Sequence, residues 1–469
     1  MSNRLSDMPR SSDSIPSTLF HPATGRFWAA LAGIGIAAGF AAGALTRLLE
    51  LIQSLAWQGS GTNILNAAKS VSGLRCITVL FIAGIVTGGG QILLRRLTTA
   101  NGIDTTAAIW FHAGKMPGFR TLGSAVLSIV VVALGASLGR EGAPKQAGAV
   151  FANWFANWTN LSDEQRRLLV ACGAGAGMAA AYGVPLGGAL FALEVLRGAL
   201  ALRYILPALF CSGLAAATAW TMLPNAPTYN FPAYKSSGPS LVMCVIVGVI
   251  AGLFSVLYVR LITKAERNKP SGRWRIVAPV IGLTGLGVAA TRFPELLGNG
   301  RDVSSMLFAG AITLPLAATL CLLKPVAIFS CVTTGVPGGL FTPSLTCGAL
   351  LGTVVAYAGS IVVPDLPHGL IAFVGACSVL AATTQGPIST MVLLMEMTGH
   401  DRSVILPMII GVFFATLIAR SVEPRSIYDA RLSDEEIAKR QQSRDMVQVG
   451  PEQAEALENL RTGTQARTP

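Results

Sequence analysis

Two long windows without a charged side chain constrain this sequence more than any other feature. One runs from Pro325 to Pro364 and the other from Leu366 to Met395, and neither contains Asp, Glu, Lys or Arg. A helix needs about 20 apolar residues to cross a hydrocarbon core of roughly 30 Å. Only 12% of the 469 residues are charged, whereas about a quarter are charged in a soluble domain. The sequence therefore predicts an all-α polytopic membrane protein that lies in a lipid bilayer.

Many of the apolar segments are short or interrupted by Gly or Pro. The expected segments lie at 27–45 and near 75–94, 122–138, 146–158, 165–182, 185–222, 238–262, 274–291, 302–333, 340–363, 368–384, 386–398 and 403–420. A broken helix leaves backbone N–H and C=O groups unpaired, which is tolerated at membrane depth only where protein or a wet cavity satisfies them. The breaks therefore indicate an interior pathway.

Positive charge gathers in one loop between two apolar segments. The net charge is +12, and the densest cluster of Lys and Arg runs from Arg260 to Arg275. Because Lys and Arg collect in cytoplasmic loops, we place this loop in the cytoplasm and do not read the charge as a nucleic-acid site. Residues 1–26 predict a polar cytoplasmic arm without a signal peptide. Residues 431–469 predict a short cytoplasmic tail.

A sequence landmark occurs twice. YGVPLGGALFALEV has a counterpart in TQGPISTMVLLMEM, and in each a proline precedes a glutamate by nine positions: Pro185 and Glu194 in the first, Pro387 and Glu396 in the second. Upstream, GREGAP corresponds to GGLFTP in the same order. Duplicated halves with Gly- and Pro-broken helices are typical of transporters whose site lies between the repeats. We expect membrane repeats at 27–222 and 223–430; spacing alone does not say whether they are inverted.

Three glycine-rich stretches precede expected helices, near Gly139–Gly142, Gly338–Phe341 and Asn101–Ile103. The first turn of a helix presents unpaired N–H groups and partial positive charge. Such an end binds an anion without a full cation, and glycine lets the backbone approach the ion closely. These stretches therefore predict anion sites along a conduction path, where an ion must enter and still leave.

Glu141 lies inside the first of these stretches. A carboxylate is itself an anion, so it can occupy a site built from helix N-termini, and on protonation it loses that attraction. One side chain could then act as both plug and proton acceptor, which fits the functional role common to acids at membrane depth. The alternative is an ion pair with Arg140 or Lys145 that only makes an interfacial loop soluble.

These motifs together resemble the CLC family of chloride channels and proton/chloride exchangers. GREGAP resembles the family's GREGP motif, GGLFTPSL its GxFxP motif, and SIYDARL its C-terminal Tyr motif, while AAYGVPLGGALFALEV resembles the stretch that follows GREGP. The resemblance spans residues 28 to 432 in the expected order. It implies two inverted halves of tilted, unequal helices with both termini cytoplasmic. It also implies a homodimer in a bacterial inner membrane, with one chloride path per subunit.

The resemblance also assigns roles to individual residues. It makes Glu141 the outer gate, gives the backbone N–H groups of Leu340 and Phe341 to the central anion, and points the Tyr428 hydroxyl at that anion from the inner side. For Phe341 and Tyr428 the alternative is ordinary core packing. The remaining residues expected around the bound chloride are Asn101, Gly102, Ile103, Gly139, Arg140, Gly142 and Gly339.

The first departure from the family pattern concerns the GSGIP motif, which is ANGID here. Asn101 stands where a serine hydroxyl normally contacts the anion. Its amide also donates hydrogen bonds but is bulkier, which puts the choice among chloride, nitrate and other anions in doubt. Asp104 replaces the proline, and we expect it to cap the short helix that follows.

The second departure lies at Glu194 and Val195. Family exchangers usually carry a second glutamate at the position of Val195, as the inner proton relay. Valine cannot carry a proton and is common there in family channels, so the sequence favours a passive anion channel. The alternative is a proton/chloride antiporter that uses Glu141, with water or Glu194 as the inner proton route. For Glu194 a structural role is also open, as an acid near the subunit interface that bonds to backbone.

Enzyme and cation-carrier functions find no support in the sequence. The eight cysteines form no CxxC pair, and the four histidines stand alone without the spacing of a metal or nucleophile site. A cation path would favour acids along its length, whereas this chain has glycine loops and few acids in its apolar segments. We therefore expect no metal, no cofactor and no enzymatic activity, with chloride as the bound ion.

Overall fold

The computed structural model describes residues 24–58, 63–98, 102–159, 161–399 and 402–440, and within them the chain is helical without β-strands. The first half comprises α1 (Thr24–Trp57), α2 (Ile64–Ser70), α3 (Gly73–Leu97), α4 (Thr105–Phe111), α5 (Gly118–Ala133), α6 (Gly142–Thr159), α7 (Asp163–Tyr182), α8 (Pro185–Phe191), a π-helical turn (Ala192–Arg197) and α9 (Leu202–Ala219). The second comprises α10 (Gly238–Arg267), α11 (Trp274–Ala290), α12 (Arg301–Phe308), α13 (Leu314–Thr333), α14 (Phe341–Gly359), α15 (His368–Thr384), α16 (Pro387–Thr398) and α17 (Ile405–Val422).

Several helices have the length and composition of membrane spans. Among the described residues, seven helices are long and apolar enough to cross a bilayer, namely α1, α3, α9, α10, α13, α14 and α17. Others are shorter, and α4 and α8 have only seven residues each. Long spans mixed with half-length helices confirm the predicted polytopic fold with broken helices.

Two of the predicted segments are each divided into separate helices. The segment 185–222 contains α8, the π-helical turn and α9, and the break falls at Gly198 with φ of 73°. The segment 302–333 contains α12 and α13, which are separated near Gly310 with φ of 68°. A left-handed backbone ends a helix, and glycine adopts it without the steric cost that a side chain brings. Hydropathy does not register these ends because apolar residues continue on both sides.

Two expected helix caps are present. The Ser162 side chain accepts from the N–H of Gln165, whose side chain accepts from the N–H of Ser162, so α7 begins with a capping box. The Asp104 carboxylate accepts from the N–H of Thr106 at 2.8 Å and caps α4. The sequence therefore located the starts of these helices correctly.

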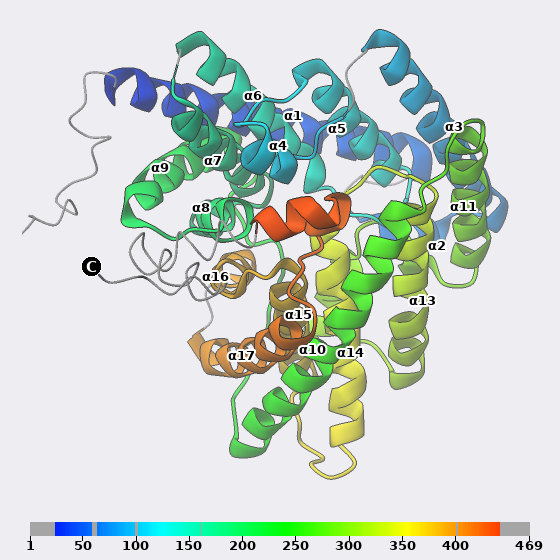
Figure 1. Ribbon diagram of the computed structural model, residues 1–469. Coiled ribbons are helices and arrows are strands. Elements are labelled where there is room, and N and C mark those ends of the chain that lie inside the picture. The colour runs from blue at the N-terminus through cyan, green and yellow to red at the C-terminus, as the bar shows by residue number, and fades with distance from the viewer. Residues whose placement is uncertain (1–23, 59–62, 99–101, 160, 400–401, 441–469) are drawn as a thin grey trace, which may run out of the picture.

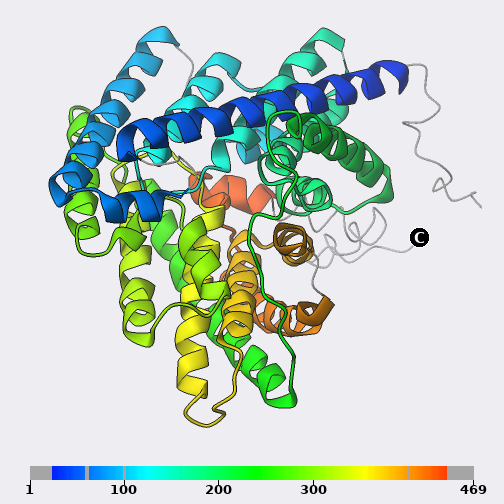
Figure 2. The ribbon, with the colours of Figure 1, turned by 180° about the vertical axis from the view of Figure 1, so that it is seen from behind.

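Each half contains a helix pair that crosses at facing glycines. Where α6 meets α7, a Cβ added to Gly173 would overlap the carbonyl of Gly148, and where α14 meets α15, a Cβ on Gly375 would overlap that of Gly348. Figures 1 and 2 show the first half, in blue to green, on one side of the second half, in green to orange. The predicted duplication thus recurs in the packing of corresponding helices.

Two carboxylates join the halves reciprocally. Glu194, from the π-helical turn, accepts hydrogen bonds from the first backbone N–H groups of α16, at 3.2 Å from Ile388 and 2.6 Å from Ser389. Glu396, from α16, accepts from the first N–H groups of α8, at 3.1 and 2.7 Å. Each acid therefore caps a helix of the other half, so Glu194 has the backbone hydrogen bonds of the predicted structural role.

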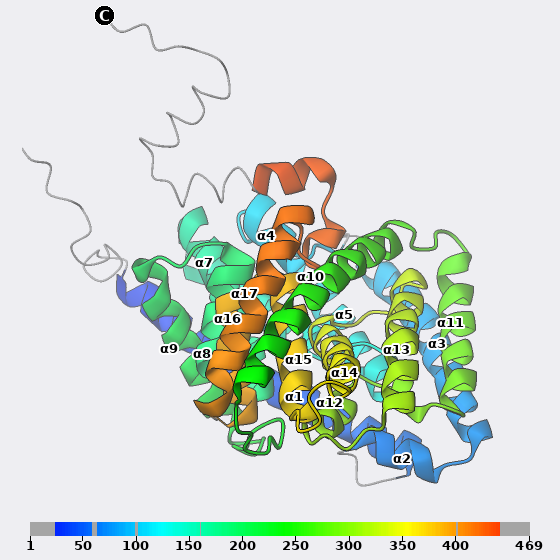
Figure 3. The ribbon, with the colours of Figure 1, turned by 90° about the horizontal axis from the view of Figure 1, so that it is seen from below.

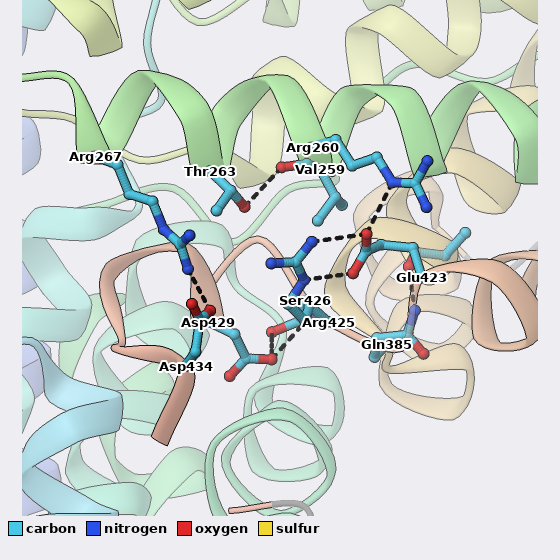
Figure 4. A network of polar contacts seen from close by, with 11 residues as sticks. Val259, Arg260, Thr263, Arg267, Gln385, Glu423, Arg425, Ser426, Asp429 and Asp434 are labelled. Atoms are coloured by element: carbon cyan, nitrogen blue, oxygen red, sulfur yellow. Dashed lines mark hydrogen bonds and ion pairs between the residues drawn. The ribbon is translucent and has the colours of Figure 1, made fainter. Parts of the chain in front are cut away.

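Charged residues join the end of α10 to the segment that follows α17 (Figure 4). Arg260 donates to the Glu423 carboxylate at 3.0 Å, and Arg425 donates to the same carboxylate at 2.5 and 2.8 Å. Arg267 pairs with Asp434. Residues 434–440 form a further helical segment that packs beside the end of α10 (Figure 3). The basic loop predicted to be cytoplasmic and the start of the tail therefore lie on the same side of the molecule.

Candidate functional site

The site forms where the two corresponding glycine loops meet. Gly139 and Gly339 form an isolated antiparallel bridge, in which the N–H of Gly139 donates to the carbonyl of Gly339 at 2.7 Å and the reverse bond is 2.8 Å. Both were expected to contribute to anion binding. Since the N–H of each glycine donates to the carbonyl of the other, their contribution here is to hold the starts of α6 and α14 together.

Glu141 lies at this junction with its carboxylate on the N-terminus of α14. Oε1 accepts from the N–H of Phe341 at 2.6 Å and of Thr342 at 3.4 Å. Oε2 accepts from the Thr342 hydroxyl at 3.2 Å and the Tyr182 hydroxyl at 3.3 Å. The side chain is 3% exposed. Its partners are amides and hydroxyls rather than Arg140 or Lys145, so the geometry favours the plug over the ion pair.

The carboxylate occupies space that glycine leaves open. A Cβ added to Gly139 or to Gly339 would overlap the carboxyl group of Glu141. Gly142, the first residue of α6, faces the same loop, since a Cβ there would come within 3.4 Å of the Gly339 nitrogen. The glycines at these positions therefore make room for a small anionic group between the two helix starts.

Two hydroxyl groups at the site have no counterpart among the residues selected from the sequence. Tyr182, at the end of α7, has its hydroxyl 2.9 Å from the hydroxyl of Thr342, and both contact Glu141. The Arg140 guanidinium lies 5.2 Å from the centre of the Tyr182 ring. In the sequence, an aromatic residue in an apolar helix looks like a residue that packs in the hydrophobic core. Only the tertiary structure shows that the Tyr182 hydroxyl faces Glu141.

Aromatic rings connect this junction to Tyr428. The Phe191 ring is 6.4 Å from the Phe341 ring and 5.7 Å from the Tyr428 ring. Lys145 Nζ lies 4.5 Å from the centre of the Tyr428 ring. Phe341 therefore packs its side chain in the core while its backbone N–H binds the carboxylate of Glu141. Leu340 is the N-cap residue of α14.

A cavity of about 560 Å³ is lined by residues of the basic loop after α10 and of the glycine loops. Its walls include Lys269 and Arg275 from the basic loop and Gly142 and Gly338 from the glycine loops. The predicted anion residues Gly102 and Ile103 also line it, whereas Asn101 lies outside the described residues. Its other charged or titratable walls are Arg95, Arg120, His112, Asp104 and Glu436. Basic side chains outnumber acidic ones on these walls, which favours the entry of anions.

Val195, at the position of the family's inner proton relay, is 1% exposed. Its backbone carbonyl accepts from the guanidinium of Arg440 at 2.7 Å. Arg440 also pairs with Asp429 and lies 5.4 Å from the centre of the Trp110 ring. A buried cation therefore covers the place where exchangers carry the second glutamate.

The family model and the curated relatives that this sequence matches all describe chloride channels. The sequence model of the family described as "Voltage gated chloride channel" matches residues 100–420. The voltage-gated ClC-type chloride channel ClcB of Shigella flexneri is 29% identical over 412 residues, covering 84% of this chain and 96% of that protein. The ClcB of Escherichia coli O81 (strain ED1a) is 28% identical over 409 residues, with the same coverage.

Solved structures show the same fold at lower identity. A slow cyanobacterial Cl⁻/H⁺ antiporter superposes with a TM-score of 0.76 at 21% identity, covering 89% of this chain and 99% of that one. A CLC-type fluoride/proton antiporter gives a TM-score of 0.68 at 21% identity, covering 86% and 98%. With the family match extending over more than half of the sequence, and with two glycine loops that meet at a buried glutamate, this chain belongs to the CLC family of voltage-gated chloride channels and related anion transporters.

Proposed function

We propose that the protein is a passive chloride channel in which Glu141 gates one pathway per subunit. The observation that carries this proposal is the carboxylate on the N–H groups of Phe341 and Thr342. The start of a helix attracts any anion of suitable size. Chloride and the carboxylate therefore compete for the same place.

Protonation of Glu141 opens the pathway in this mechanism. A neutral carboxyl group is held less strongly by N–H donors and by the dipole of α14. The hydroxyls of Tyr182 and Thr342 remain in place as donors to an entering anion. The basic cavity described above then serves as the cytoplasmic entrance.

The surroundings of Val195 support passive conduction. A proton route from the cytoplasm needs a group that can bind a proton, and valine has none. The Val195 carbonyl accepts from the guanidinium of Arg440, a group that donates hydrogen bonds but cannot accept a proton. The carboxylate of Glu194 is fully engaged with the N–H groups of α16. This arrangement disfavours Glu194 as a substitute relay.

A reversal-potential measurement in liposomes tests the proposal against proton/chloride antiport. With a chloride gradient and a superimposed pH gradient, a passive channel reverses at the chloride equilibrium potential whatever the pH gradient is. A reversal potential that moves with the pH gradient shows that chloride and proton transport are coupled, and the protein is then a proton/chloride antiporter. Liposomes that contain the protein but show no chloride flux at any pH would contradict both.

We also propose a homodimer in a bacterial inner membrane with both termini in the cytoplasm. The family resemblance supports the dimer, and the basic loop after α10 supports the orientation. Protein purified in mild detergent is expected to have twice the mass of one chain by light scattering. Protease added outside intact spheroplasts is expected to leave a C-terminal tag uncut. A monomer would contradict the proposed dimer, and a cleaved tag would contradict the cytoplasmic C-terminus.

A further inference from the structure

Lys145 is a second ionisable residue buried in α6, one turn after the gate. Its backbone N–H donates to the carbonyl of Glu141 at 3.3 Å, so the two residues lie on the same face of the helix. The Lys145 side chain is 7% exposed in the segment that follows the glycine loop. An ammonium group at this depth is costly, which makes a function in the ion pathway the first explanation to test.

The two side chains of this face have different neighbours. Glu141 reaches the N-terminus of α14, whereas the Lys145 ammonium lies over the Tyr428 ring. Tyr428 belongs to the segment after α17 whose neighbours Glu423 and Asp434 bind the basic end of α10. The ammonium is therefore displaced from the gate toward the cytoplasmic side.

The cavity reaches the same part of α6. Gly142 lies three positions before Lys145 and Gln146 one position after it, and both line the cavity. The rings of Tyr428 and Phe191 connect the ammonium with Phe341, whose N–H binds the carboxylate. The lysine itself is not a wall of the cavity, but it lies between these two lining residues and the aromatic rings that lead to the proposed gate.

A full charge at this position changes what the site selects. Helix N-termini offer partial charges, which hold an anion weakly enough for it to leave. A compact ammonium creates a stronger local field than those dipoles, so it favours small anions with concentrated charge over large, weakly hydrated ones. The ammonium group would therefore raise the affinity of the site for chloride relative to thiocyanate.

We propose that Lys145 is an anion-binding residue on the cytoplasmic side of Glu141 that determines selectivity for chloride. This inference rests on the proposed anion conduction and deepens it, because it adds a buried cation between the basic cavity and the backbone and hydroxyl donors around Glu141. The nearby Tyr428 ring positions the ammonium through a cation–π contact.

The test uses Lys145→Gln and Lys145→Met, which remove the charge, and Lys145→Arg, which keeps it in a more diffuse form. Lys264→Gln is the matched control, because Lys264 is exposed at the cytoplasmic end of α10 and loses the same charge. Chloride binding to purified protein is measured by isothermal titration calorimetry. Chloride and thiocyanate permeabilities are measured in liposomes.

We expect the two neutral variants to bind chloride more weakly by on the order of 10-fold and to lose preference for chloride over thiocyanate. Lys145→Arg is expected to bind chloride within about threefold of the unmodified protein but with reduced preference over thiocyanate, since a guanidinium is larger and more weakly hydrated. Lys264→Gln is expected to match the unmodified protein in both measurements.

Neutral variants that fold and keep both affinity and selectivity would overturn the inference. If neither neutral variant folds, Lys145→Arg decides alone, and an unchanged chloride to thiocyanate ratio contradicts the proposal. Absence of chloride flux in the unmodified protein contradicts the proposed function. Normal chloride flux, with neutral Lys145 variants that keep the chloride affinity and selectivity of the unmodified protein, contradicts only this inference.

Discussion

At the scale of single residues, Glu141 combines features that an inert ion pair would not need. Its two oxygens are held by backbone N–H groups at the start of α14 and by the hydroxyls of Thr342 and Tyr182. A Cβ on Gly139 or Gly339 would overlap the carboxyl group, so the glycines leave it room. Under the proposed function the same donors hold chloride once the carboxylate leaves, and the gate and the chloride site are then the same place.

Glu141→Gln is expected to increase chloride efflux from liposomes several-fold and to make it independent of pH. The neutral amide no longer competes as an anion for the N–H of Phe341. Efflux is measured between about pH 5 and about pH 8, where the unmodified protein should respond to pH. Glu50→Gln, which neutralises an acid in an exposed pair with Arg47, is the control. Loss of flux in a folded Glu141→Gln protein contradicts the plug.

Val195→Glu is expected to leave the transport uncoupled from protons. The new carboxylate would lie next to Arg440, whose guanidinium already binds the Val195 carbonyl, and an ion pair there would keep it charged. The reversal potential under a pH gradient is the measurement. A shift away from the chloride equilibrium potential in this variant, absent from the unmodified protein, would show that one acid is sufficient for coupling.

At the scale of elements, short helices between the halves depend on acids from the opposite half. The first N–H groups of α16 and α8 have no partner within their own helices, and at membrane depth water does not supply one. Glu194 and Glu396 fill that need. Repeat spacing predicted that these acids correspond, but their exchange across the halves required the tertiary structure, because Glu194 is 194 residues from Ile388 and Glu396 is 210 residues from Leu186.

Glu194→Ala and Glu396→Ala are each expected to destabilise the protein by about 1–3 kcal/mol, because each leaves two N–H donors in the first turn of a helix without an acceptor. Thermal unfolding in detergent measures the effect. Each glutamine variant should retain part of the stability, since its amide oxygen still accepts a hydrogen bond. A Glu194→Ala protein that is as stable as the original but has altered pH dependence of flux would instead indicate a proton relay.

Element boundaries show where hydropathy stops being informative. Ser162 and Asp104 identified helix starts because their side chains cap locally. Gly198 and Gly310 were not identified as breaks, because one glycine among many in an apolar run carries no local signal of its backbone angle. The difference is physical, since a cap is encoded by neighbouring residues whereas a left-handed glycine is selected by the packing around it.

At the scale of the whole molecule, the sequence predicted the membrane fold and the duplication, and it singled out Glu141, which lies where the two glycine loops meet. It did not identify Tyr182, Thr342 or Arg440, whose roles arise from contacts between distant segments. Lys145 was noticed only as a possible partner of Glu141, and its contact with Tyr428 became visible only in three dimensions. Motifs encode backbone geometry near the site, whereas the surrounding side chains come from the fold.

The charged contacts of Figure 4 link α10, α17 and the start of the tail, and they predict a pH-dependent stability. Arg425, with further help from Arg260, holds the pKa of Glu423 below its ordinary value although burial opposes this. A pKa lowered on folding stabilises the protein above the ordinary value, and this stabilisation is lost as pH falls through the folded value.

Glu423→Gln is therefore expected to lower the melting temperature in detergent at neutral pH, with a loss of about 1–3 kcal/mol. The difference from the unmodified protein should shrink as the pH falls below the ordinary carboxyl range and through the lowered pKa of Glu423 in the folded protein. Glu50→Gln again serves as the exposed control. A difference that stays constant over this range would show that the charge of Glu423 is irrelevant.

The reciprocal bonds of Glu194 and Glu396 carry a consequence for origin and assembly. A polypeptide containing only one half would have a short helix with an open first turn and an acid with nothing to cap. A second copy of the same polypeptide could supply both missing partners by symmetry. A protein of half this length would therefore be expected to form a homodimer. Fusion of two copies of its gene would keep these reciprocal hydrogen bonds within one chain.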